Sequence, residues 1–368
     1  MVDEVRVINN FLNMVKISSP SLNEREMADY LKKELSEMGL VVIEDNAGDK
    51  YGGNAGNIIA VLPAPGKKKL LFSAHMDTVV PCEKITPIVK DGVISSDGTS
   101  VLGADDKAGI AAIIEMIRDI KETNVEHPEI IAVFSIAEEI GLLGAQSLEL
   151  DKYKPDYAFI IDSGGTPGTV VVQTPYSAKG EIKIIGKTAH AGLAPELGIN
   201  ALTVASHAIT KIKLGRIDSE TTSNIGIVKG GSAVNIVMPE VSMTYEARSF
   251  SGDKLKGLLK ETMEIFEETA KSFGAKCEHQ VSIGYSGYKI EEDSELLKIL
   301  AKASEKAEIE LKTVSSGGGC DANIYSGRGI PSINLGIGMS NVHTCNETIK
   351  IVDIVNCTKL ISAIVKSV

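Results

Sequence analysis

The sequence contains no tryptophan, and only 4% of its residues are aromatic. Proteins that bind single-stranded nucleic acid stack the bases on aromatic side chains, so this composition argues against that class. Basic residues are also outnumbered by acidic ones, and the formal net charge is −11. This charge disfavours binding to the phosphate backbone of nucleic acids and to anionic membranes.

Neither a membrane segment nor a disulfide framework is expected. No apolar run approaches the roughly 20 residues that a membrane-spanning helix needs. The first residues, MVDEVRVINNFLNMVKISSPS, lack the basic region and apolar core of a secretory signal. The five cysteines are scattered, without the short spacing of a zinc knuckle or a redox motif: Cys82, Cys277, Cys320, Cys345 and Cys357. We therefore predict reduced thiols and a cytoplasmic location.

The chain of 368 residues is long enough for two domains, or for one domain with a large insert. In the first part, apolar strand patterns alternate with helical patterns, which predicts an α/β sheet covered by helices on both faces. The pattern then changes to two helices and a few half-buried strands, which predicts a small α+β unit with one exposed sheet face. We predict a catalytic domain made of residues 1–177 and 290–368, interrupted by a lid domain at residues 178–289.

Near the start of the chain, Ser21 and Glu24 have the spacing of a capping box. In this motif a hydroxyl and an acid three residues later bind backbone N–H groups at the start of a helix. Apolar residues follow at helical spacing from Met27 to Met38, and Gly39 can end the helix. The pattern predicts a helix that begins near Ser21 and ends near Gly39.

Histidines and acids follow four of the predicted strands directly. In open α/β sheets, ligands gather outside the carboxyl ends of the strands. Taken singly, each position has an ordinary structural explanation, such as a loop histidine, a helix cap or an acid that opens a turn. The strand-end residues are His75, with Asp77 two residues later, the adjacent Glu138 and Glu139, Asp162 and His343, and Asp105 stands at a predicted helix start.

Together these residues supply the ligands for two divalent metal ions. Each ion would receive one imidazole and one carboxylate, and a shared carboxylate would bridge them at the ~3.5–4 Å separation of two-metal hydrolases. One acid is left over, which is what a general base requires. Burial of so many acids without cations would be costly in free energy. We expect zinc, with cobalt or manganese as alternatives.

Six segments in succession resemble a known family of zinc exopeptidases. They are SAHMDTV, GADDKAG, AEEIGLLGA, IDSGG, KTAHAGLAPELGINAL and NVHTCNE. The family contains peptidase T, carboxypeptidase G, aminoacylase and succinyl-diaminopimelate desuccinylase, and GADDKAG and GGGCDANIYSGRGIPSINLGIG are most similar to peptidase T-like proteins. The resemblance covers the whole chain. It implies an α/β catalytic domain with a mixed, mostly parallel sheet, plus an inserted α+β lid domain that forms a homodimer.

The resemblance also implies roles for individual residues of the catalytic domain. Glu138 would be the general base that activates water, and Asp77 would orient His75. The implied metal ligands are His75 and Asp162 for one ion, Glu139 and His343 for the other, and Asp105 as the bridge between them.

For the lid domain, the resemblance implies that three residues bind substrate. His190 would reach the active site of the partner subunit and stabilise the oxyanion, and Asn235 and Arg248 would help to hold the substrate carboxylate. Judged from the residues alone, His190 would be a surface histidine without a partner, and Arg248 would pair with an acid on its own sheet.

The implied activity is hydrolysis of peptide bonds by an aminopeptidase that acts on short peptides. Two alternatives stay open: an N-acyl amino acid deacylase with the same metal site, and a non-catalytic metal-binding protein, against which the spare acid Glu138 argues. A two-metal phosphoesterase is disfavoured, because no basic, glycine-rich helix start is suited to phosphate. The chain departs from peptidase T at Ser316, where that protein has an arginine, so strict recognition of tripeptides is not implied.

Overall fold

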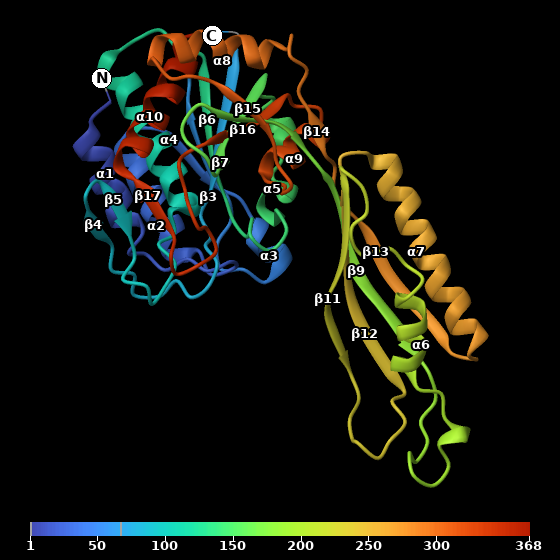
Figure 1. Cartoon of the computed structure of the whole chain (residues 1–368). Coiled ribbons are helices and arrows are strands. Elements are labelled where there is room, and N and C mark those ends of the chain that lie inside the picture. Colours follow the sequence, from blue (N-terminus) through green and yellow to red (C-terminus); the bar gives the residue numbers. More distant parts are fainter. Residues whose placement is uncertain (1, 67) are drawn as a thin grey trace. The chain divides into compact units, whose positions relative to one another are not determined.

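The computed structural model describes residues 2–66 and 68–368, and the chain divides into two compact units. The first unit runs up to Gln173 and also contains Lys289–Ser316 and Cys320–Val368. The second unit contains Thr174–Tyr288 and Gly317–Gly319. Figure 1 shows the elements of each unit. That the second unit acts as a lid and as a dimerisation domain stays a prediction.

The first set of elements consists of helices and mostly short strands, and apart from the strand residues Thr174 and Tyr288 it lies outside the second unit. None of the helices within residues 2–66 and 68–368 combines the length and the apolar character that crossing a bilayer requires. The helices are α1 (Glu4–Met14), α2 (Arg25–Glu37), α3 (Ala47–Tyr51), α4 (Ala104–Thr123), α5 (Leu143–Ser147), η1 (Leu150–Lys152), α8 (Glu295–Ala307), α9 (Asp321–Gly327) and α10 (Ile351–Val365). The strands are β1 (Val41–Glu44), β2 (Ile58–Leu62), β3 (Lys69–His75), β4 (Ile88–Lys90), β5 (Val93–Ser95), β6 (Glu129–Ser135), β7 (Tyr157–Ser163), β8 (Thr169–Thr174), β14 (Tyr288–Lys289), β15 (Lys312–Ser315), β16 (Ser332–Gly336) and β17 (Thr348–Lys350).

A nine-stranded mixed sheet organises the first unit. Its strand order is β1-β2-β6-β3-β7-β16-β8-β14, and β15 pairs with β8. Strand β3 pairs in parallel with β6 and β7, and β16 pairs in parallel with β7. The pairs β1–β2, β2–β6 and β16–β8 are antiparallel. The predicted mixed sheet is therefore confirmed, and the carboxyl ends of its four central strands lie at one edge.

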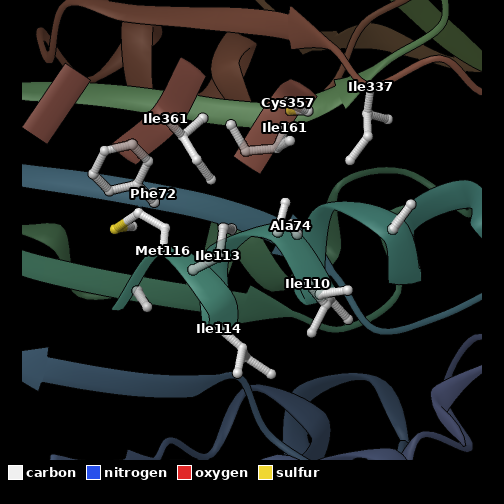
Figure 2. Close-up of a cluster of buried hydrophobic side chains, with 14 of the residues drawn as sticks. Phe72, Ala74, Ile110, Ile113, Ile114, Met116, Ile161, Ile337, Cys357 and Ile361 are labelled. Carbon is white, nitrogen blue, oxygen red and sulfur yellow. The ribbon is translucent and has the colours of Figure 1, made fainter. Parts of the chain in front are cut away.

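Strand β3 is buried on both faces of this sheet. Phe72 lies in a cluster with Ile113 and Met116 of α4, and all three side chains are fully buried (Figure 2). Ser73 has its hydroxyl oxygen 3.2 Å from the hydroxyl oxygen of Tyr325, which belongs to α9. Because successive side chains of a strand point to opposite faces, α4 and α9 cover different faces of the sheet, as the apolar strand pattern predicts.

The capping box predicted at Ser21 and Glu24 is wrong. The helix α2 begins at Arg25, and the Glu24 side chain makes no capping hydrogen bond. Ser21 donates its hydroxyl instead to Asp77 Oδ2, at 2.6 Å. The motif's spacing is present, but Ser21 binds the distant Asp77, and Glu24 accepts Leu22 N and the distant Ala137 N instead of Ser21 N. A local pattern cannot reveal the distant partners.

The second unit is a five-stranded antiparallel sheet with two longer helices. The strand order is β10-β11-β12-β9-β13. Alternate residues of β12 are buried, and Tyr245 of that strand packs in one core with Leu255 and Phe266 of α7. The sheet therefore has a face covered by helices and a more exposed face. The elements are β9 (Tyr176–Ile185), η2 (Pro195–Leu197), α6 (Ala201–Ile209), β10 (Gly215–Arg216), β11 (Thr221–Gly230), β12 (Glu240–Ser249), α7 (Gly252–Ser272) and β13 (Lys276–Tyr285).

Replacing Ile113 by alanine should lower the free energy of unfolding by about 2–5 kcal/mol, because its loss leaves a cavity beside α4. Chemical denaturation of the metal-free protein measures this change. The control is Val5→Ala, since Val5 is 71% exposed and its replacement should change stability by less than about 0.5 kcal/mol. Equal effects of the two substitutions would contradict the assignment of Ile113 to the core.

Candidate metal centre

The carboxyl ends of the central strands deliver most of the predicted site residues. His75 is the last residue of β3 and pairs in register with Ser135, the last residue of β6. Glu138 and Glu139 follow β6 after two residues, and Asp162 lies near the end of β7. These side chains come from separate stretches of the chain but share one edge of the sheet, because β3, β6 and β7 are parallel neighbours.

The carboxylate of Asp105 lies between two imidazoles. Its Oδ1 is 3.0 Å from His75 Nε2, and its Oδ2 is 3.3 Å from His343 Nε2. A second acid approaches each imidazole: Glu139 Oε2 is 3.0 Å from His343 Nε2, and Asp162 Oδ1 is 3.8 Å from His75 Nε2. The structure thus brings together all five residues that were predicted as ligands, arranged as two half-sites that share Asp105. Their role as metal ligands stays a prediction.

The tautomer of His75 follows from its other ring nitrogen. His75 Nδ1 lies 2.8 Å from the backbone oxygen of Asp77, and a carbonyl oxygen only accepts hydrogen bonds, so Nδ1 carries the proton. In a neutral imidazole, the lone pair of Nε2 is then free to bind a cation placed between the imidazole and the acids. Asp77 therefore orients His75 mainly through its backbone carbonyl, since its Oδ1 is 3.5 Å from Nδ1.

The carboxylate of Asp77 holds backbone groups instead. Its Oδ1 accepts a hydrogen bond from Glu138 N at 2.9 Å, and its Oδ2 accepts one from Glu139 N at 3.2 Å. Oδ2 also accepts the hydroxyl of Ser21. Asp77 is fully buried. Its side chain therefore fixes the segment that carries the two adjacent glutamates.

Burial and mutual proximity shift the ionisation of the acids. Burial, together with the charge of Asp162, raises the pKa of Glu138 well above its ordinary value. Burial likewise raises the pKa of Asp162. The hydrogen bonds of Asp105 and Glu139 raise the pKa of His343 to about 10. Acids crowded in this way favour either protonation or a bound cation.

One oxygen of Glu139 identifies where a cation fits. Among the residues that the structure describes, Glu139 Oε1 is buried and has no hydrogen-bond partner. One ligand atom from each of His75, Asp105 and Glu139 lies within 4.8 Å of the other two. A buried carboxylate oxygen without a donor is costly in free energy, and a cation would remove this cost. Nitrogen and carboxylate donors suit borderline divalent ions such as zinc.

Asp106 offers a second way to group the ligands. One of its oxygens lies within 4.8 Å of ligand atoms of His75 and Asp162. However, Asp106 is fully buried, and its two oxygens already accept hydrogen bonds from His75 N at 3.3 Å and Gly109 N at 3.2 Å. This arrangement favours Asp105, which faces both imidazoles, as the predicted shared acid, whereas Asp106 binds backbone N–H groups.

Two further buried acids support the site and were not predicted to do so. Glu347 accepts hydrogen bonds from Gly103 N at 2.7 Å and from Asp105 N at 2.9 Å, so it fixes the backbone of the shared acid. Asp321 accepts the hydroxyl of Ser135 at 2.5 Å, at the end of β6. Glu347 lies in the motif NVHTCNE and Asp321 in GGGCDANIYSGRGIPSINLGIG, which was the available signal, although neither motif says which group the acid binds.

The three predicted lid residues lie in the second unit. His190 and Asn235 belong to neighbouring loop segments, since Ala191 N donates to the backbone oxygen of Asn235 at 2.9 Å, and both side chains are exposed. Arg248 lies on β12 and forms an ion pair with Glu246, with 2.5 Å between Nη2 and Oε1. The pairing of Arg248 with an acid on its own sheet is therefore present. Substrate contacts by these residues stay predictions.

The fold and the donor set define a class, that of metallopeptidases, and comparisons with known proteins agree. The model of peptidase family M20/M25/M40 matches residues 71–367. The chain belongs to this family and is a hydrolase of peptide bonds. The predicted family resemblance is thus confirmed.

Three relatives match over nearly their whole length. The uncharacterized protein YqjE of Bacillus subtilis is 41% identical over 367 residues, with 100% of this chain and 99% of YqjE covered. The crystal structure of aminopeptidase PepT from Bacillus cereus has a TM-score of 0.91 at 41% identity, covering 100% and 99% of the two chains. The structure of a tripeptidase from Staphylococcus aureus has a TM-score of 0.94 at 40% identity, covering 100% and 98%.

Replacing His343 by alanine should remove one of the two expected metal ions. The other half-site keeps His75, Asp162 and the shared Asp105, so it should still bind its ion. Metal analysis of the dialysed protein measures the number of ions per chain. His127→Ala is the control, because that imidazole lies 2.8 Å from its neighbouring backbone oxygen, Pro128 O, and is not part of the cluster. Loss of no ion, or of both ions at once, would contradict the division into two half-sites.

Proposed function

We propose that this peptidase is an aminopeptidase that acts on short peptides with two divalent ions, zinc being the expected metal and cobalt or manganese the alternatives. The names of two solved relatives, aminopeptidase PepT and a tripeptidase, support the choice of substrate. The donor set of imidazoles and carboxylates supports zinc. A cytoplasmic location is part of the proposal, and it is supported by the five cysteines, which are all unpaired.

The observation that carries this proposal is the position of Asp105. Its two carboxylate oxygens approach two different imidazoles, at 3.0 Å and 3.3 Å. A single metal site needs only one such contact, whereas a bridging carboxylate needs both. His75 and Asp162 would hold one ion, Glu139 and His343 the other, and Asp105 both. When bound, such a pair of ions supplies Lewis acids and a water of lowered pKa.

In this proposal Glu138 moves the proton during hydrolysis. Its backbone is fixed by Asp77, and it adjoins the ligand Glu139 without being needed as a ligand itself. Its carboxylate would take a proton from the attacking water and pass it to the nitrogen of the leaving amine. A base with this role must be held within hydrogen-bond distance of the water. The hydrogen bonds of Asp77 to the backbone of Glu138 and Glu139 would help to hold it there.

The proposal includes a homodimer formed through the second unit. In it, His190 would stabilise the oxyanion in the partner's site, and Asn235 and Arg248 would hold the substrate carboxylate. Exposed apolar side chains next to these loop residues support an interface, since Leu193 is 80% exposed and Val234 is fully exposed. Besides its ion pair with Glu246, Arg248 donates a hydrogen bond from Nη1 to the backbone oxygen of Gly317 at 2.9 Å.

Replacing Glu138 by glutamine should lower kcat by about 10²–10⁴-fold, because the amide cannot accept the proton. Both metal ions should remain bound, since the five ligands are unchanged. The measurement combines steady-state kinetics with metal analysis, and Glu83→Gln, on an exposed side chain, is the control. Near-normal turnover in the Glu138 variant would exclude it as the base.

A substrate panel separates the aminopeptidase from an N-acyl amino acid deacylase. We expect the metal-loaded protein to cleave dipeptides and tripeptides with a free amino terminus, and to act on the matching N-acetyl amino acids at least about tenfold more slowly in kcat/KM. Peptides with a blocked amino terminus are the control for the free amine. A preference for N-acetyl amino acids would favour the deacylase, and metal binding without turnover of any substrate would favour a non-catalytic metal-binding protein.

A further inference from the structure

A segment near the start of the chain, outside the region that matches the family, binds the loop that follows His75. Residues 17–24 precede residue 71, where the match begins. Ser19 donates its hydroxyl to the backbone oxygen of Met76 at 2.8 Å, and its own backbone oxygen accepts Thr78 N at 2.9 Å. Ser21 binds Asp77, as described above. The segment therefore contacts each of the three residues that follow His75, from Met76 to Thr78.

Glu24 ends this segment and is fully buried. Its Oε1 accepts two backbone hydrogen bonds, from Leu22 N at 2.8 Å and from Ala137 N at 3.0 Å. Its Oε2 is buried and has no hydrogen-bond partner within the part of the chain that the structure describes. A buried acid is costly, so its presence requires a specific use. The contact with Ala137 indicates that use, because Ala137 immediately precedes Glu138.

Two carboxylates together bind three consecutive backbone N–H groups. Glu24 accepts Ala137 N, and Asp77 accepts Glu138 N and Glu139 N. Ala137 has φ of 50°, in the left-handed region that is unfavourable for residues with a Cβ atom. The surrounding contacts must hold this conformation, and it sets the direction in which the next residue leaves the strand.

We propose that Glu24 is a positioning residue for Glu138: by accepting Ala137 N, it holds the left-handed turn that aims the Glu138 carboxylate. This inference rests on the proposed role of Glu138 as the base. Asp77 alone cannot serve this purpose, because its two oxygens are used by the next two N–H groups and by Ser21. Glu24 acts through the backbone and does not touch the substrate.

The proposal concerns hydrogen bonding rather than charge. Burial and the neighbouring Asp77 raise the pKa of Glu24 to about 7. Oε1 accepts both N–H groups whether or not Oε2 carries a proton, and the amide oxygen of a glutamine can accept them as well. Glu24→Gln should therefore preserve the turn, whereas Glu24→Ala should release it.

The first experiment measures kcat, KM and bound metal for Glu24→Ala and Glu24→Gln, with the exposed Glu26→Gln of α2 as the matched control. Misplacement of a base by about 1 Å can cost on the order of 100-fold in rate, so kcat of Glu24→Ala should fall by about 10–100-fold with KM and both ions retained. Glu24→Gln should recover most of this loss. Activity lost only in proportion to lost metal, or an equal loss in both variants, would overturn the proposal.

A double-mutant cycle separates positioning from general structural support. If Glu24 acts through the Glu138 carboxylate, Glu24→Ala should change the residual rate of Glu138→Gln by less than about twofold. Full additivity of the two losses would overturn the proposal, and so would a wild-type kcat in Glu24→Ala. Should Glu24→Ala fail to fold, Glu24→Asp, which shortens the reach to Ala137, replaces it in the cycle. Normal turnover in Glu138→Gln alone would instead remove the base assignment itself.

Discussion

The sharing of one carboxylate between two imidazoles is the constraint on which this structure depends. Asp105 can face His75 and His343 together only if the end of β3, the start of α4 and the loop beyond β16 converge within a few ångströms. Parallel pairing of β3 with β6 and β7 provides that convergence, because parallel strands end at the same edge. The buried core between α4 and the sheet supports this edge. The mixed sheet is thus the means by which distant residues meet.

The carboxylates around this centre fall into two groups, those that face imidazoles and those that bind backbone N–H groups. Asp105, Glu139 and Asp162 direct oxygens towards imidazoles, which suits cation binding. Glu24 and Glu347, together with Asp77 and Asp106, direct theirs towards backbone N–H groups, which fixes the segments that carry the other acids. A carboxyl oxygen can accept more than one backbone N–H group, as Glu24 Oε1 does, so a single acid can fix two points of the backbone. The second group therefore gives the first its geometry.

The first kind of acid could be predicted from the sequence, whereas of the second kind only Asp77 was predicted, and for the orientation of His75 rather than for its contacts with backbone N–H groups. Apolar strands that run directly into His75 or Glu138 reveal a strand end, and the sum of such ends indicates a shared site. Glu24 binds Ala137 N, 113 residues away, and Glu347 binds Gly103 N, 244 residues away, and no local pattern encodes such contacts. The capping-box prediction failed for this reason. The spacing of Ser21 and Glu24 fits a capping box, but in the folded chain they bind Asp77 and Ala137 N, which are distant in sequence.

The backbone conformation of the site explains why it needs so much support. His343 has φ of 63° and Ala137 has φ of 50°, and neither is a glycine, so both turns are less stable by themselves than extended or helical backbone. Such conformations persist only where the surroundings determine them. Near Ala137, the carboxylates of Glu24 and Asp77 accept hydrogen bonds from the backbone N–H groups of the turn. In addition, Gly141 N and Leu142 N donate to the backbone oxygen of Glu138. Because both the N–H group and the backbone oxygen of Glu138 are bound, these contacts fix the backbone from which the Glu138 side chain departs.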